Sequence, residues 1–152
     1  MKEQIINGIN YRLDEDTLTA EVIQDHDNDC DGDIVIPEKV ESEKLPYCVT
    51  SIGDWAFELC TELTSITIPK GVTNIGSYAF FACKSLKVIA LPESVMCIGD
   101  SAFNGCSSLK NIDIPNGVTE IGGNAFEGCS LLTTITIPEG VTTIGSHVFN
   151  GC

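Results

Sequence analysis

The chain of 152 residues repeats itself every 23 residues over most of its length. The aligned copies read "LTSITIPKGVTNIGSYAFFACKS", "LKVIALPESVMCIGDSAFNGCSS", "LKNIDIPNGVTEIGGNAFEGCSL" and "LTTITIPEGVTTIGSHVFNGC". Phenylalanine and cysteine keep this interval, at Phe57, Phe80, Phe103, Phe126 and Phe149 and at Cys60, Cys83, Cys106, Cys129 and Cys152. One such unit cannot bury its apolar side chains alone, so the units must stack. The period therefore predicts a solenoid with the phenylalanines in its core.

Each unit has three parts separated by breaking residues. In "LTSITIP", apolar residues alternate with Thr and Ser until Pro69 ends the run, which predicts a short strand with one inward face. "KGVTNIG" predicts a turn, and "SYAFFAC" is long enough only for a helical turn that points Phe80 inward. We therefore expect an α/β repeat solenoid of the leucine-rich-repeat type. It would have about five coils of 23 residues, with short parallel strands on one side and short helical turns.

The N-terminal part departs from the repeat. An irregular copy precedes the others, with eleven residues between Pro37 and Val49 where later copies have two, so we expect a first coil that carries an insertion. Upstream, two alternating apolar runs flank the polar "DEDT", which predicts a β-hairpin that caps the first coil. The expected division is a hairpin cap with an acidic loop at 1–33 and a solenoid at 34–152, with coils at 34–60, 61–83, 84–106, 107–129 and 130–152.

These units closely resemble the BspA-type leucine-rich repeat family. The shared hallmarks are Ile68-Pro69, Ile75-Gly76 and Ala79-Phe80 followed by Cys83, and residues 49–152 carry them throughout. The opening segments "IVIPE" and "YCVTSIG" also look like the start of such an array. The resemblance implies a right-handed solenoid used for adhesion or protein recognition on bacterial surfaces, and it implies no catalytic apparatus. It places the protein outside the cell or on its surface, with any leader missing from this chain.

Composition narrows the classes of partner. Eight Lys and Arg against 22 Asp and Glu give a net charge of −14, which disfavours nucleic acids and anionic lipids. No run approaches the roughly 20 apolar residues of a membrane span, and "MKEQIINGINYRL" lacks the apolar stretch of a secretion signal. Membrane insertion is therefore not expected, and a cytoplasmic location is the alternative to the cell surface.

The acidic segment "DHDNDCDGDIVIPE" at 25–38 matches the spacing of an EF-hand loop, from Asp27 to Glu38. An EF-hand needs flanking helices, whereas strand-like sequence lies on both sides. A calcium site of another kind would use the alternating aspartates Asp27, Asp29, Asp31 and Asp33. The alternative is a solvated loop between the hairpin and the first coil, and no other cofactor is expected.

The cysteines and histidines offer no catalytic set. The periodic cysteines are expected to be structural thiols, because stacked side chains point in parallel and meet poorly for a disulfide. Cys30, Cys48 and Cys97 lie off this ladder, and no CxxC pair suggests a zinc site. His26 and His147 are far apart, and no nucleophile, base and orienting acid can be assembled, so we expect no enzyme.

The outward positions of the predicted strands differ from coil to coil, while the inward ones do not. This sheet face is the first candidate for binding a protein, or alternatively a glycan. Trp55 and Phe81 are further exposed aromatic candidates. The competing hypothesis is a structural module that associates with itself by stacking its uncapped C-terminal coil. The predicted sheet-face residues are Thr64, Ser65, Thr67, Lys87, Val88, Ala90, Lys110, Asn111, Asp113, Thr133, Thr134 and Thr136.

Overall fold

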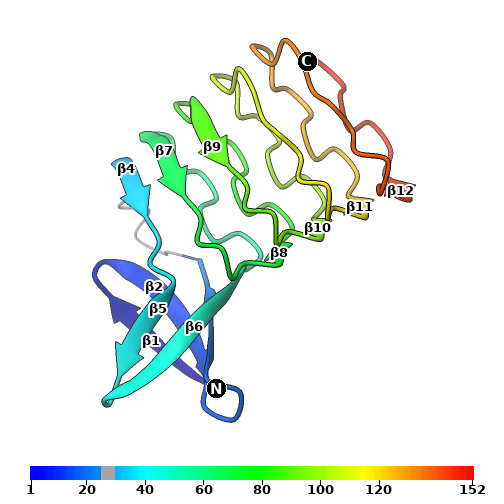
Figure 1. Cartoon of the computed structure of the whole chain (residues 1–152). Coiled ribbons are helices and arrows are strands. Elements are labelled where there is room, and N and C mark those ends of the chain that lie inside the picture. The colour runs from blue at the N-terminus through cyan, green and yellow to red at the C-terminus, as the bar shows by residue number, and fades with distance from the viewer. Residues whose placement is uncertain (25–29) are drawn as a thin grey trace.

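The computed structural model describes residues 1–24 and 30–152, and these form a stack of coils with a β-rich N-terminal end (Figure 1). Figure 1 shows successive coils lying side by side from β4 and β6 toward the C-terminus. The repeat fold with parallel sheet that the sequence predicts is confirmed. No helix of the described residues could cross a membrane.

The N-terminal end is an antiparallel arrangement that runs directly into the solenoid. Strand β1 (Lys2–Ile6) pairs with β2 (Ile9–Asp14), and β2 pairs with β3 (Thr19–Val22). Strand β3 then pairs in parallel with β6 (Leu45–Ile52), the first solenoid strand of this sheet. The β2–β3 hairpin thus lies against the edge of the first coil and occupies backbone groups that would otherwise be exposed.

The insertion in the first coil is itself a β-hairpin. Strand β5 (Lys39–Ser42) pairs antiparallel with the first half of β6. Its turn reaches β1, where Lys2 forms an ion pair with Glu43 and the Ser42 hydroxyl donates a hydrogen bond of 2.6 Å to Gln4 Oε1. The additional residues therefore brace the N-terminal strands.

Two parallel ladders run along the stack, on different sides of it (Figure 1). We call the first the strand ladder: it comprises β4 (Gly32–Val35), β7 (Leu63–Thr67) and β9 (Val88–Ala90), and it continues as a single bridge between Asn111 and Thr134. The second extends β6 through β8 (Asn74–Ile75), β10 (Cys97–Ile98), β11 (Glu120–Ile121) and β12 (Thr143–Ile144). The sequence indicated strands on one side only. The segments around the Ile-Gly pair, interpreted as turns, form this second ladder.

The segments expected to be helical turns are not helices in the described chain. In residues 54–60, the amides of Trp55, Phe57 and Leu59 donate to carbonyls of the next coil, at 2.8–2.9 Å. The intervening amides donate within the segment, as Glu58 does to the carbonyl of Trp55. An α-helix needs consecutive internal bonds, so this alternation excludes one. The prediction of helical turns is not supported, because every second amide of the segment donates to the next coil instead of within its own coil.

This alternation requires an unusual backbone in each coil. Trp55 has a φ of 56°, and the residues that occupy the same slot in later coils have φ values between 54° and 57°. Left-handed geometry is disfavoured for bulky residues, so the hydrogen bonds between coils must offset its cost. Those later residues are Tyr78, Ser101, Asn124 and His147.

Close backbone approach explains the glycine after each ladder isoleucine. A Cβ on Gly99 would lie 2.6 Å from the backbone nitrogen of Ser77 in the preceding coil, a distance that real Cβ atoms do not show. Any side chain there would push two coils apart, so the Ile-Gly pair is a stacking requirement.

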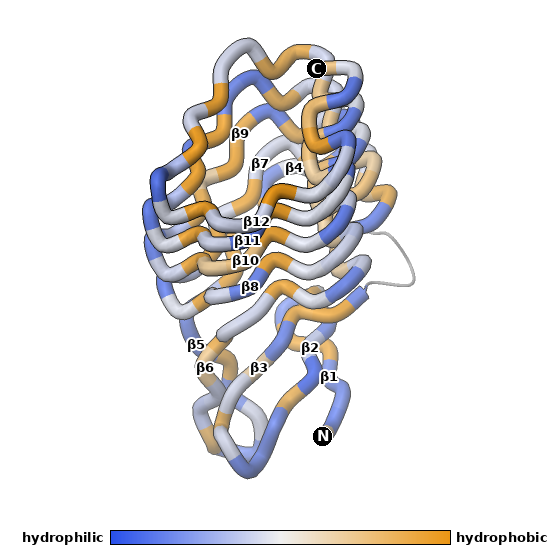
Figure 2. The backbone as a smooth tube through the Cα atoms, turned by 90° about the vertical axis from the view of Figure 1, so that its right-hand side faces the viewer, coloured by the Kyte–Doolittle hydropathy of each residue, from blue (hydrophilic) through white to orange (hydrophobic). Residues whose placement is uncertain are grey.

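The core is a column of equivalent side chains. Phe57, Phe80, Phe103 and Phe126 are buried, and adjacent rings lie nearly parallel with centroids 5.3–5.4 Å apart. Apolar residues recur at matching places along successive coils in Figure 2. The core role predicted for these four phenylalanines is confirmed, whereas the side chain of Phe149 is 38% exposed.

Candidate functional site

The predicted sheet face lies on β7, β9 and the matching segments of the next two coils (Figure 1). Of its twelve residues, ten are exposed, and Thr64 and Ser65 are half-buried. Inward neighbours such as Leu63, Ile66 and Ile89 are buried, so the alternation of a strand sets which side chains reach solvent. Strand pairing sets Ser65 beside Val88 and Thr67 beside Ala90, and a bridge joins Asn111 to Thr134. The role of the twelve residues in binding stays a prediction.

The sheet face combines apolar and charged groups. Val88 is 63% exposed, and Val35 of β4, which lies outside the twelve predicted residues, is 68% exposed. Lys87 and Lys110 contribute positive charge to a strongly acidic chain. Exposed apolar side chains within a mixed-charge surface are typical of protein contact sites. The signal for Val35 was in the sequence, because it precedes Ile36-Pro37 as Thr67 precedes Ile68-Pro69.

Asp33 connects this face to the acidic loop. Its Oδ1 accepts hydrogen bonds from the hydroxyls of Ser65, at 2.6 Å, and Thr64, at 2.8 Å. These bonds favour the carboxylate and lower the pKa of Asp33 below its usual range. Asp33 is therefore held at the edge of β7 by the face residues themselves.

Only two of the four aspartates predicted to bind calcium, Asp31 and Asp33, lie among the described residues. Asp27 and Asp29 lie outside the described residues, and Asp31 is exposed. Among residues 1–24 and 30–152, no group of three acidic, histidine or cysteine side chains is arranged to hold a metal ion. Calcium binding by the aspartates stays a prediction, and thermal melting with calcium and with chelator tests it.

The periodic thiols have a specific structural role. Each Sγ donates to the carbonyl of the phenylalanine in the preceding coil: Cys83 to Phe57 at 3.1 Å, and so on through Cys106, Cys129 and Cys152 at 3.1–3.2 Å. Burial raises the pKa of Cys129 to about 12. All four cysteines act as hydrogen-bond donors between coils, as predicted for structural thiols, and Cys83, Cys106 and Cys129 are buried.

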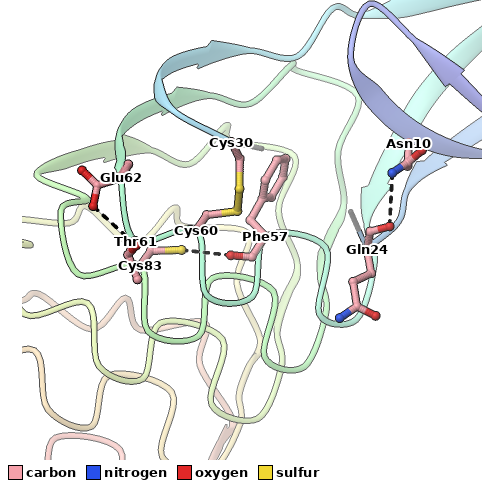
Figure 3. The surroundings of a disulfide bond; sticks show 8 residues. All are labelled: Asn10, Gln24, Cys30, Phe57, Cys60, Thr61, Glu62 and Cys83. Carbon is pink, nitrogen blue, oxygen red and sulfur yellow. Dashed lines mark hydrogen bonds between the residues drawn. A yellow bond between two sulfur atoms is a disulfide. The ribbon is translucent and has the colours of Figure 1, made fainter. Parts of the chain in front are cut away.

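Cys60 is the exception, and here the expectation of a free thiol is wrong. It forms a disulfide with Cys30, with Cα atoms 5.6 Å apart (Figure 3). The first coil has no preceding phenylalanine carbonyl for a thiol to contact, so the ladder role is absent at this position. Cys30 arrives from the end of the acidic segment rather than from a stacked coil, so the parallel geometry that disfavours disulfides within the ladder does not apply. Spacing alone gave no signal of this pairing.

An aromatic cluster covers the turns of the first two coils. Trp55 lies 44% exposed, with its ring 10° from parallel to Tyr78 and centroids 6.1 Å apart, and Phe81 meets Tyr78 edge-on. Trp55 and Phe81 were candidates from the sequence, whereas Tyr78 was missed. The signal was present, because Trp55 and Tyr78 are 23 residues apart and therefore share one repeat slot.

The sequence pattern and the fold agree with one known family. The sequence model of the BspA type leucine-rich repeat region matches residues 37–152 in six copies. The chain belongs to this family. The five coils expected from the period are one fewer than the six matched copies, and the exact number of coils stays a prediction. Proteins of this family are generally protein-binding or surface proteins.

Solved structures of related proteins share the fold. A leucine-rich repeat protein from Bacteroides ovatus is 40% identical, with a TM-score of 0.87 over 96% of this chain and 38% of its own. The leucine-rich repeat protein of T. pallidum is 30% identical, with a TM-score of 0.84 over 98% of this chain and 67% of its own. A leucine-rich cell surface protein from Faecalibacterium prausnitzii is 29% identical, with a TM-score of 0.71 over all of this chain and 52% of its own. No curated protein matches the chain.

Proposed function

We propose that this BspA-type repeat chain is a non-catalytic recognition module that binds another macromolecule, a protein or a glycan, through its sheet face. The observation that carries the proposal is the contrast between the two sides of the same strands. Ile66 and Ile89 are buried at equivalent places, whereas their strand neighbours Thr67, Val88 and Ala90 reach solvent, and the outward residues differ in charge and size from coil to coil. A rigid ladder that presents varied side chains at fixed spacing suits recognition.

The disulfide supports a location outside the cytoplasm. Disulfides persist in oxidising compartments and are rare where thiols are kept reduced. The Cys30–Cys60 bond, together with the family's association with surface proteins, fits adhesion at the cell surface.

A displayed random-peptide library tests the sheet face while the natural ligand is unidentified. Binders selected on the native chain should lose affinity for a chain that carries Val88→Glu and Lys110→Glu, because these changes alter both the apolar and the charged part of the face. The control is Thr119→Glu, which changes an exposed residue outside the twelve. Binders that ignore the face variant but respond to the control would contradict the proposal.

The second candidate function is self-association through the last coil. Its side chains Leu131, Ile144 and Phe149 are 50%, 51% and 38% exposed. Stacking of a second copy would cover them, as each coil covers the one before it. Sedimentation over a wide concentration range decides between the two, since a strict monomer at high concentration rules this candidate out.

A further inference from the structure

We propose that a groove between the N-terminal strands and the first coil binds a neutral sugar ring, with Trp55 as its stacking platform. None of the twelve sheet-face residues lines this groove. The site is therefore separate from the surface proposed above, and either can fail without the other.

The groove lies where β1, β2 and β3 meet the turn that follows β6. Its volume is about 320 Å³, at the lower end of the roughly 300–1,000 Å³ typical of small-ligand sites, which suits a single ring. These four segments converge here because β2 pairs with β1 and β3, and β3 pairs with β6. Its polar and aromatic lining side chains are Glu3, Arg12, Glu21, Gln24, Asp54 and Trp55, and Ile23 lines it as well.

The stacking geometry of Trp55 leaves one ring face for a ligand. One face of its indole is turned toward Tyr78 in the next coil, nearly parallel to that ring. The opposite face must then point back toward the N-terminal strands, where the groove lies. Trp55 is 44% exposed and lines the groove, so part of its indole is open to a ligand there. Aromatic faces of this kind pack against the apolar C–H surface of a ligand while its polar groups stay hydrated.

The polar groups of the groove fit a neutral ligand. Arg12 donates to Glu21 Oε2 at 2.9 Å and to Glu3 Oε1 at 3.3 Å, so both signs of charge stand side by side. An anionic ligand would meet three carboxylates, from Glu3, Glu21 and Asp54, beside the one guanidinium, and a cationic ligand would have to compete with that guanidinium, which already pairs with two of them. A ligand whose hydroxyls both donate and accept can use both kinds of group without a net charge conflict.

The polar side chains of the groove are held by hydrogen bonds, and they retain further donors and acceptors for a ligand. Asp54 Oδ1 accepts a hydrogen bond of 2.7 Å from the Ser77 amide, and a carboxylate has several further acceptor positions. Gln24 donates to Glu58 Oε2 at 3.4 Å through its amide nitrogen, and its carbonyl oxygen is an additional acceptor. A guanidinium has five donors, of which the two ion pairs use only part. An aromatic wall with fixed donors and acceptors is the arrangement that a pyranose ring requires.

Trp55 also provides the first measurement, because it is the only tryptophan in the chain. The native chain is titrated with the methyl glycosides of glucose, galactose and N-acetylglucosamine while tryptophan fluorescence is recorded. We expect a saturable shift in emission with at least one glycoside, at a dissociation constant on the order of millimolar for so small a ligand. Choline and acetate are titrated in parallel, and neither should produce a saturable shift.

The second measurement locates the binding. Saturation-transfer NMR of the glycoside protons compares Trp55→Asn with the native chain, and we expect at least a roughly tenfold loss of affinity. Asparagine occupies the same slot at Asn124 with the same φ of 56°, so this variant preserves the backbone. The matched control is His147→Asn, which places asparagine in the equivalent slot of a distant coil. This variant should bind the glycosides as the native chain does.

The outcomes separate clearly. A saturable shift that is lost in Trp55→Asn and kept in His147→Asn supports the site. No response to any glycoside, a response to choline or acetate instead, or glycoside binding that survives Trp55→Asn would overturn it. The fluorescence result on the native chain stands even if the variant folds poorly.

Discussion

The first and last coils contain equivalent residues in different surroundings. Ile52 and Phe57 of the first coil are 0% and 3% exposed, whereas Ile144 and Phe149 in the same slots of the last coil are 51% and 38% exposed. In the first coil, β3, the disulfide and the second coil cover these positions; in the last, only the preceding coil does. At these two slots a residue's own coil does not bury it, and burial comes from the coils on both sides, although the smaller Val148 of the last coil is buried at 4% exposure.

Thiol chemistry should show the largest contrast. Cys129 is buried with a pKa raised to about 12, while Cys152 is exposed. At pH 8 the thiolate fraction of Cys129 falls about three orders of magnitude below that of an ordinary thiol. Burial raises the pKa of Cys152 as well, so alkylation of Cys129 should be roughly tenfold to a hundredfold slower than that of Cys152. Mass-spectrometric mapping of iodoacetamide labelling measures both rates. Equal rates would show that the last coil is as well covered as the one before it.

Truncating a phenylalanine should likewise cost more stability in an interior coil than in the last coil. Phe103 is fully buried between two stacked rings, so Phe103→Ala should lower the free energy of unfolding by about 3–5 kcal/mol. Phe149→Ala removes a ring that stacks on one side only and should cost roughly 1–2 kcal/mol. Urea denaturation gives both values. A loss of unfolding free energy in Phe149→Ala as large as that in Phe103→Ala would contradict the difference between the last coil and the interior coils.

The disulfide tests the first coil. Opening the Cys30–Cys60 link by Cys30→Ser with Cys60→Ser should destabilise the chain by about 2–4 kcal/mol, because a loop of 30 residues is released in the unfolded state. Cys97→Ser changes a half-buried free thiol and serves as the control. If the double variant melts like the control, the bond contributes nothing to covering the first coil.

The smallest effect concerns Tyr11, a buried residue of β2. Its hydroxyl is buried and finds no hydrogen-bond partner among the described residues. Tyr11→Phe should therefore leave stability unchanged or raise it by about 1 kcal/mol near pH 7. Urea denaturation of the two chains at that pH gives the difference.

The same pair of proteins predicts a pH dependence. Burial raises the pKa of Tyr11 to about 12, so the folded state holds the phenol proton that the unfolded state releases near pH 10. The native chain should lose stability relative to Tyr11→Phe as pH rises from 10 toward 12. A constant difference over this range would show that the hydroxyl is not buried in solution.

The features that depend on the 23-residue period could be predicted from the sequence. The solenoid, the inward phenylalanines and the structural thiols follow because a fixed period forces equivalent residues into the same place in each coil. The helical turns are not confirmed, because the amides of Phe57 and its neighbours bond to the next coil, and no single repeat shows that competition. The disulfide and the groove were missed for a related reason. Each joins a segment outside the period to a residue of the first coil, Cys30 to Cys60 in the disulfide and Arg12 to Trp55 in the groove.

The hydrogen bonds between coils have a mechanical consequence. Between the coils at 61–83 and 84–106, bonds form on three sides, for example from Lys87 to Thr64, from Gly99 to Ile75 and from Phe80 to Ala102. Bending the stack in any direction would stretch at least one of these sets, so the solenoid should behave as a stiff rod. Each 23 residues extend it by only about 4.8 Å, whereas the same residues fully extended would span about 75 Å. The stack is therefore short for its number of residues but stiff, and it holds its outward side chains at fixed separations even when a force is applied.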